Sequence, residues 1–115
     1  MVVNMNLKLY KSNKIELEYS NIKALNKEES ISFIIDNIKT TLNNDFFIRE
    51  NNEFKFVLDI KNKSCIYFFK EKGMTFDIAV ENLYFKRRFN YICLIYKIET
   101  DEEELKIEIN LENGE

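Results

Sequence analysis

Alternating side chains between Asn90 and Glu99 give the strongest structural signal in this chain. One phase consists of Ile92, Leu94, Tyr96 and Ile98, and the other of Tyr91, Cys93, Ile95 and Lys97. Successive residues of a strand point to opposite faces, and here both phases are largely apolar. The run is too short to span a membrane as a helix and is rich in β-branched and aromatic residues. It therefore predicts a strand that is buried on both faces, or one that faces a barrel interior on one side and a partner on the other.

Short alternating runs recur along most of the chain. They predict strands at 2–10, 15–25, 46–50, 54–60, 65–69, 74–85 and 105–111. Polar turns separate them, including Lys86–Phe89 before the strand at 90–99, and a shift of phase at Glu81-Asn82 predicts a bulge or bend within 74–85. Connections this short exclude the crossover helices that a parallel sheet needs. The pattern predicts an all-β fold, an antiparallel meander that closes into a barrel or sandwich.

Residues 28–42 fit two structures equally well. As a helix, the segment places Ile31, Ile34, Ile35, Ile38 and Leu42 on one face, with Asn26 as a possible cap. As two strands, it alternates on either side of a turn at Asp36-Asn37. The helix leads to an alternative α+β fold, in which one helix at 28–42 packs on a curved antiparallel sheet.

Several segments resemble a family of uncharacterised bacterial proteins, the calycin-like β-barrel domain also called the YwiB-like family. They are Asp45–Arg49, Phe54–Ile60, Lys72–Ile78, Ile92–Ile98 and Leu105–Ile109. The shared features are a strand that ends in arginine, a glycine between long strands, and a tyrosine in the penultimate strand. The resemblance covers residues 28–111 and implies a calycin- or lipocalin-like barrel in which residues 30–42 form two strands. The family has no assigned chemistry, so the resemblance implies a fold rather than an activity.

Length and charge narrow the class of protein. A chain of 115 residues predicts a single domain, 1–115. The net charge of -3 argues against non-specific binding to nucleic acid. The N-terminus lacks the layout of a signal peptide, and Cys65 and Cys93 lie in apolar runs, as buried free thiols do in a reducing compartment. We therefore expect a cytoplasmic protein.

The residues that most enzymes use are scarce. The chain contains no histidine, which removes the commonest general base and nitrogen metal ligand. Two isolated cysteines cannot form a structural zinc site, and the two glycines belong to no phosphate-binding loop. The sequence predicts a protein without catalytic residues, metal or cofactor.

Two groups of residues are candidates for binding. Of the 16 aromatic residues, 13 lie between Phe46 and Tyr96. They are expected to fill the interior; alternatively, they line a cavity in which Arg49 binds the carboxylate or phosphate of a ligand and Tyr96 donates a hydrogen bond. The pattern does not decide whether Arg49 points in or out. The second group is a basic patch of Lys86, Arg87 and Arg88, for which a solvated hairpin turn is the simpler interpretation.

Two functions fit these observations. The first is a small barrel that binds a small apolar or amphipathic ligand. The second is a protein–protein interaction module, such as a regulator or a phage-type inhibitor; the apolar faces of residues 90–99 also suggest a homodimer.

The run Asp101–Glu104 is expected to form a solvated turn.

Overall fold

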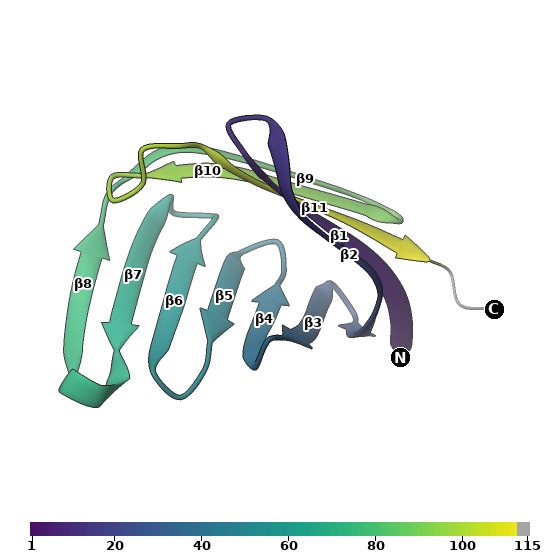
Figure 1. Cartoon of the computed structure of the whole chain (residues 1–115), viewed down its shortest axis with the longest axis horizontal. Coiled ribbons are helices and arrows are strands. Elements are labelled where there is room, and N and C mark those ends of the chain that lie inside the picture. Colours follow the sequence, from purple (N-terminus) through teal and green to yellow (C-terminus); the bar gives the residue numbers. More distant parts are fainter. Residues whose placement is uncertain (113–115) are drawn as a thin grey trace.

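Strands make up most of the chain in the computed structural model, which describes residues 1–112 (Figure 1). The elements are β1 (Val2–Lys11), β2 (Lys14–Lys27), β3 (Ser30–Ile35), β4 (Ile38–Leu42), β5 (Phe46–Glu50), β6 (Phe54–Asp59), β7 (Ser64–Phe69), the short 3₁₀ helix η1 (Lys70–Lys72), β8 (Met74–Ile78), β9 (Val80–Arg88), β10 (Tyr91–Ile98) and β11 (Leu105–Glu112). Within residues 1–112 there is no α-helix, and no helix has the length and apolar character to cross a membrane. The alternative of a helix at 28–42 is therefore wrong.

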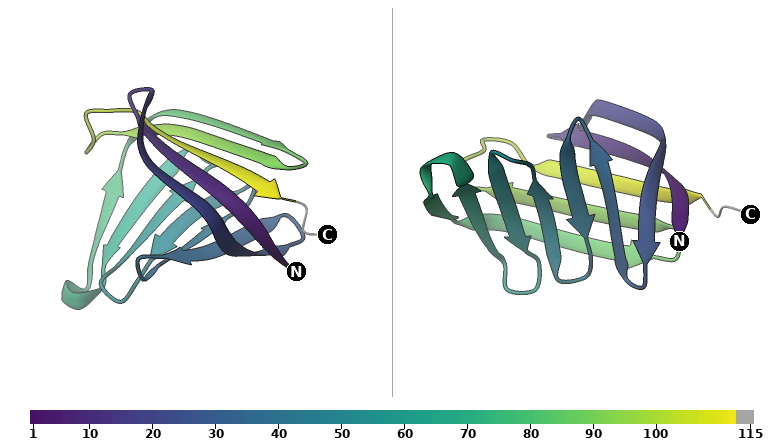
Figure 2. Two further views of the ribbon diagram at one scale, coloured as in Figure 1. Left: turned by 45° about the vertical axis from the view of Figure 1, so that its right-hand side comes forward. Right: turned by 90° about the horizontal axis from the view of Figure 1, so that it is seen from below.

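All eleven strands belong to one antiparallel sheet. Their order is β8-β7-β6-β5-β4-β3-β2-β1-β11-β10-β9, so every neighbour in the sheet except β1 and β11 is also a neighbour in sequence. The sheet bends into two halves that face each other: β3–β8 run across β9, β10, β11, β1 and β2 (Figures 1 and 2). The result is a nearly closed barrel, which confirms the predicted all-β antiparallel meander.

Two-residue turns explain why residues 30–42 form a hairpin. Asp36 and Asn37, between β3 and β4, both have positive φ, at 53° and 63°. Ser12 and Asn13, between β1 and β2, also have positive φ. Two consecutive left-handed residues are the signature of a type I′ turn, whose twist matches that of the adjoining strands, and asparagine and aspartate tolerate that conformation best. The hairpin also places Ile31, Phe33 and Leu42 in the core.

Strand β2 carries the sheet from one half of the barrel to the other. Its first part pairs with β1 and its last three residues pair with β3. The register with β1 shifts between Met5 and Leu7, where Asn21 has φ 57° and donates its backbone N–H to Oδ1 of Asn6 at 3.1 Å. An extra residue of this kind is a β-bulge, which bends and twists a strand.

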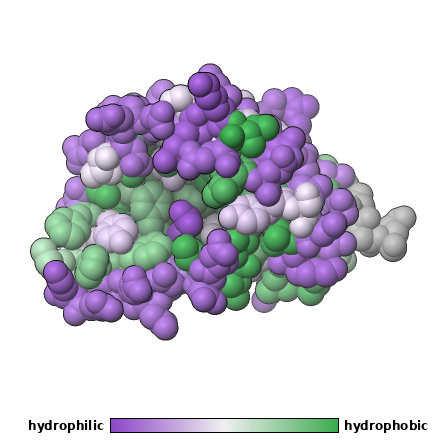
Figure 3. All heavy atoms as spheres, viewed as in Figure 1, coloured by the Kyte–Doolittle hydropathy of each residue, from purple (hydrophilic) through white to green (hydrophobic). Residues whose placement is uncertain are grey.

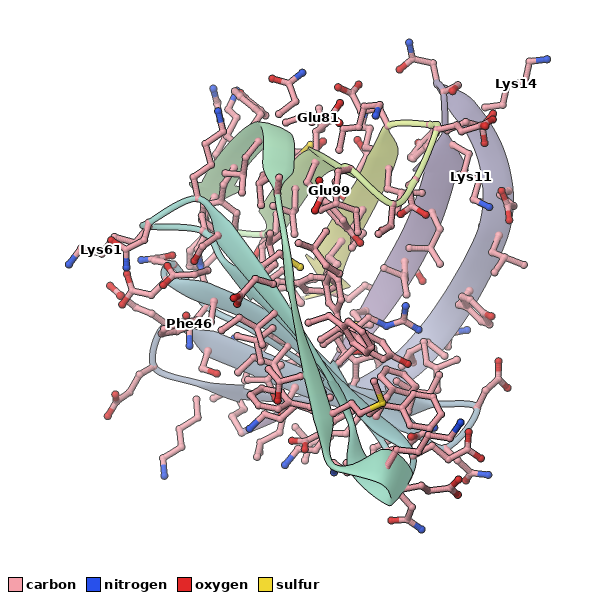
Figure 4. All side chains as sticks on the ribbon, turned by 90° about the vertical axis from the view of Figure 1, so that its left-hand side faces the viewer. Lys11, Lys14, Phe46, Lys61, Glu81 and Glu99 are labelled. Atoms are coloured by element: carbon pink, nitrogen blue, oxygen red, sulfur yellow. The ribbon has the colours of Figure 1, made fainter. Side chains whose placement is uncertain are left out.

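The second bend lies at Ala79, between β8 and β9, and corrects the predicted long strand at 74–85. The predicted irregularity at Glu81-Asn82 is also present: Asn82 pairs with Lys97 and Val80 with Ile98, so the register between β9 and β10 shifts there and Glu81 is the extra residue of a bulge. The Ala79 N–H donates to the Glu99 carboxylate at 2.9 Å, and the Ala79 carbonyl accepts from the Glu99 N–H, also at 2.9 Å. Figure 4 shows Glu99 beside this corner. A distant residue therefore fixes the bend, and β8 and β9 remain the two edges of the sheet.

The core lies between the two halves. Ile31, Leu42, Phe47, Leu58 and Cys65 contribute from β3–β7, and Ile92, Leu94 and Ile109 from the opposite half. Prediction and structure agree on the inner face of β10, where Leu94 is fully buried. On the outer face Cys93 is buried, whereas Tyr91, Ile95 and Lys97 are each partly exposed. Burial of both faces, as predicted, therefore holds only for the inner face.

Candidate functional site

A row of six side chains crosses the inner face of β3–β8. Each is the direct cross-strand partner of the next: Phe33, Thr40, Arg49, Phe56, Tyr67 and Phe76. Directly opposed residues on one face lie close enough for their side chains to touch. Arg49 therefore points into the barrel, between a threonine and an aromatic ring. Phe33 is buried, whereas Phe76 at the β8 edge is 46% exposed, so the row runs from the core to solvent.

A cavity of about 310 Å³ lies on one side of this row, and we call it the tail cavity. Its walls are mostly apolar and come from both halves of the barrel. The apolar lining includes Leu7, Leu9, Phe33, Ile35, Phe47 and Ile107. Lys11, Glu16, Asp36 and Lys106 also line it. Figure 3 shows the hollow between the two halves, with hydrophobic walls and hydrophilic borders.

A second cavity of about 250 Å³ lies beside the first, and we call it the head cavity. Phe56, Tyr67, Ile78, Ile98, Thr100 and Asp101 line this cavity alone, whereas Arg49, Tyr96 and Leu105 line both. The expectation that aromatic rings fill the whole interior is therefore wrong. The rings instead form a cluster beside the cavities: the centroid of Tyr96 lies 6.0 Å from that of Phe47 and 6.2 Å from that of Phe56.

Arg49 and Tyr96, which the sequence suggested as partners, lie together where the two cavities meet. Tyr96 is only 5% exposed. Burial raises the pKa of its hydroxyl, and the positive charge of Arg49 opposes that rise. The guanidinium is therefore near enough to act on the hydroxyl. Their role in ligand binding stays a prediction.

The guanidinium of Arg49 is not in any of the ion pairs that the described residues form. Next to it in the row is Thr40, which is buried like Tyr96. A guanidinium presents five N–H donors in a planar fork that suits a carboxylate or phosphate. The hydroxyls of Thr40 and Tyr96 are suited to bind the same anion.

The predicted basic patch does not form one surface. Lys86, Arg87 and Arg88 belong to β9 rather than to a turn, and the chain turns at Phe89 and Asn90 instead. Because β9 is extended, Arg87 shares the inner face with its partner Ile92, and Nη1 of Arg87 donates to the Glu29 carbonyl at 2.5 Å. The arginine in the middle of the patch therefore links β9 to the turn between β2 and β3, and only Lys86 and Arg88 face outward.

Sequence reasoning missed Thr40 and Asp101. Thr40 was not among the predicted site residues, although its phase with Leu42 places it on the inner face. Asp101 was expected in a solvated acidic turn, but it is half-buried and lines the head cavity. No periodicity could show this, because Asp101 lies outside any strand.

Another polar cluster lies on the outer face and is internally satisfied. Glu108 accepts hydrogen bonds from the hydroxyls of Tyr10, at 2.7 Å, and Tyr91. Both bonds lower the pKa of the Glu108 carboxyl, and the bond from Tyr91 has the larger effect. The bond that Tyr10 donates to Glu108 raises the pKa of the Tyr10 hydroxyl to about 12. Cys93 lies directly beside Glu108 in the register. The cluster fixes the outer surface of β1, β10 and β11.

Carboxylates and thiols are the side chains of this chain that could bind a metal, because it contains no histidine. Within residues 1–112, no three of the side chains that bind metals are placed to hold an ion together. Cys65 and Cys93 are both buried and free, and they belong to opposite faces of the sheet, which keeps them apart.

Comparison with protein-family models, with curated proteins and with solved structures finds no match to this chain. The resemblance of residues 28–111 to the YwiB-like family therefore stays a prediction.

Proposed function

We propose that this protein binds a small amphipathic anion without acting on it chemically. The apolar tail of the ligand occupies the tail cavity, and its carboxylate or phosphate binds Arg49 together with the hydroxyls of Tyr96 and Thr40. The observation that carries the proposal is the inward-facing guanidinium of Arg49, which has no ion-pair partner within residues 1–112 and lines both cavities.

Two physical arguments support this assignment. Arg49 is exposed to solvent while it lines both cavities, so its guanidinium is hydrated in the unbound protein and is accessible to an incoming anion. Binding sites for small molecules are typically apolar cavities with a few convergent polar groups, and they start at about 300 Å³. The tail cavity matches that description in size and lining.

The experiment is calorimetric titration of the protein with decanoate, measured on the native chain and on Arg49→Met. Methionine keeps much of the side-chain length and removes the charge. Because a hydrogen bond to a charged group contributes about 1.5–3 kcal/mol, we expect Arg49→Met to weaken binding roughly 10- to 100-fold. Tyr96→Phe removes one neutral donor and should weaken binding about 5-fold.

Arg88→Met is the matched control, because it removes the same charge from an exposed position on the outer face. Its affinity for decanoate should equal that of the native chain. Equal losses in Arg49→Met and Arg88→Met would show that decanoate responds only to net charge. Failure of the native chain to bind decanoate or decyl phosphate would refute the proposal.

A second candidate function is binding of a protein partner through a free sheet edge, including a second copy of this chain. The specific observation is that β8 is an unpaired edge strand with Met74 and Phe76 each 46% exposed. Exposed edges of this kind can pair with another strand. We expect sedimentation equilibrium to detect a dimer that Thr75→Lys on β8 dissociates and Thr41→Lys on the interior strand β4 does not; a monomer at all concentrations would exclude the homodimer.

The free thiols also suggest where the protein works. Buried cysteines without a disulfide are typical of reducing compartments, so we propose a cytoplasmic location. Fractionation of the native host, followed by detection of the chain in the cytoplasmic fraction, tests this proposal; recovery from an extracellular fraction would contradict it.

A further inference from the structure

The head cavity differs from the tail cavity in the charge that it contains. Besides Arg49 it is lined by Asp101, so two side chains of opposite charge face one space of about 250 Å³. They come from opposite halves of the barrel: Arg49 from β5, and Asp101 from the loop that follows β10. Neither residue belongs to an ion pair within residues 1–112. The cavity therefore holds an anionic and a cationic wall that do not neutralise each other directly.

The backbone of Asp101 is fixed while its carboxylate remains available. Its N–H donates to the Ile98 carbonyl at 3.1 Å, and its carbonyl accepts from Nζ of Lys97 at 3.0 Å. The ammonium of Lys97 is itself paired with the Glu81 carboxylate at 2.9 Å. Lys97 therefore supports the loop through the Asp101 carbonyl and not through its carboxylate, while Asp101 lines the head cavity and its charge raises the pKa of the Tyr96 hydroxyl.

Aromatic rings complete the surroundings of that carboxylate. Phe56, Tyr67 and Tyr96 all line the head cavity. Phe56 and Tyr67 are cross-strand partners, and the centroids of Phe56 and Tyr96 are 6.2 Å apart. Aromatic faces attract cations through their negative ring centres, and a carboxylate beside such rings strengthens the attraction. This combination is suited to a protonated or quaternary amine and is unsuited to a second apolar tail.

We propose that the ligand has a zwitterionic headgroup, with its anionic group at Arg49 and its ammonium group between Asp101 and the rings of Phe56 and Tyr67. The apolar tail then extends from Arg49 into the tail cavity. This inference rests on the proposed function and adds the class of headgroup. The order of groups along the ligand follows from the geometry, because Arg49 and Tyr96 line both cavities whereas Asp101 lines the head cavity alone.

The test compares amphiphiles that share a decyl chain and differ in the headgroup. Decyl phosphate carries the anion alone, decylphosphocholine carries the anion and a quaternary amine, and decyltrimethylammonium carries the cation alone. Calorimetric titration of the whole chain, below the micelle concentration of each probe, gives the affinities. We expect decylphosphocholine to bind at least 5-fold more tightly than decyl phosphate. Decyltrimethylammonium should bind most weakly, because it leaves Arg49 without an anion.

Two variants separate the role of Asp101 from the effect of net charge. Asp101→Asn should lower the affinity for decylphosphocholine to that for decyl phosphate, and it should leave decyl phosphate binding equal or tighter. Glu102→Gln removes the same charge from an exposed neighbour in the same loop and should change neither affinity. Both positions are at the surface end of the barrel, and circular dichroism and thermal melting of each variant confirm that it is folded.

The outcomes distinguish this inference from the proposed function. Equal affinities for decyl phosphate and decylphosphocholine, or an Asp101→Asn variant that still prefers decylphosphocholine, would overturn the zwitterionic headgroup and leave the anion site in place. If neither these probes nor decanoate bind, the proposed function fails as well.

Discussion

Leu94 offers the most direct test of the core. It lies at the centre of β10 and is fully buried, between its cross-strand partners Ile107 on β11 and Phe85 on β9. Replacing it by alanine removes apolar contacts between the two halves of the barrel without altering any polar group. We expect Leu94→Ala to fold and to be strongly destabilised.

The size of the effect follows from burial. Leucine to alanine removes three carbon groups, and at about 0.8 kcal/mol for each buried group the transfer term is about 2.4 kcal/mol. The space left behind adds to this, which brings the expected loss in the free energy of unfolding to about 3–4 kcal/mol. A chain of 115 residues has an unfolding entropy of about 0.24 kcal/mol/K, so the melting temperature should fall by roughly 12–17 °C.

Leu25→Ala is the matched control, because Leu25 is also a leucine in a strand but is 48% exposed. It loses about half of the transfer term and leaves no closed space, so we expect a loss of about 1 kcal/mol. The assay is urea unfolding followed by circular dichroism at several wavelengths. The midpoint should fall far more in Leu94→Ala than in Leu25→Ala, with the slope unchanged in both. Equal losses in the two variants would refute the assignment of the core between the two halves.

Three further predictions follow from local features. Gly73 has φ 59° and open space where a Cβ would be, so Gly73→Ala should cost only backbone strain, about 1 kcal/mol by thermal melting, and Gly73→Asn less. The pKa of the Tyr10 hydroxyl is raised to about 12 in the folded state, so its contribution to stability is complete below pH 10 and is lost as the pH rises through about 12. Titration followed by absorbance at 295 nm should show a midpoint near pH 12, and Glu108→Gln should lower that midpoint. The thiols of Cys65 and Cys93 are buried, and burial raises the pKa of Cys65 to about 11, so a thiol reagent at pH 8 should label both only as fast as the protein opens; rapid labelling of either would contradict its placement.

Most of the strands could be predicted from the sequence because a period of two residues is a local property. Phe46–Glu50 matches β5 residue for residue, and the turn at Asp36-Asn37 lies where predicted. The ambiguity of residues 28–42 could not be resolved locally, because isoleucines at those spacings suit one face of a helix and also the inner face of a hairpin. Pairing of β3 with β2 and of β4 with β5 decides it.

The candidate site was only partly predictable. Arg49 and Tyr96 were identified by residue type, but the inward direction of Arg49 depends on its place in the row between Thr40 and Phe56. The role of Arg87 in contacting Glu29 could not be predicted, because the two residues are 58 positions apart. Hydrogen bonds over such separations depend on how the halves of the sheet are placed.

The sequence by itself determined the strands, their apolar phases and the polar turns, since each depends on neighbouring residues and on backbone preferences. The tertiary structure decided which apolar phase became the interior and where the sheet bends. The corner at Ala79 carries no glycine or proline, and it forms because Glu99, 20 positions further along, bonds to both its N–H and its carbonyl. That corner brings Tyr96 and Asp101 over the row that contains Arg49. The cavities exist because the two halves cross and diverge, and no single segment contains that information.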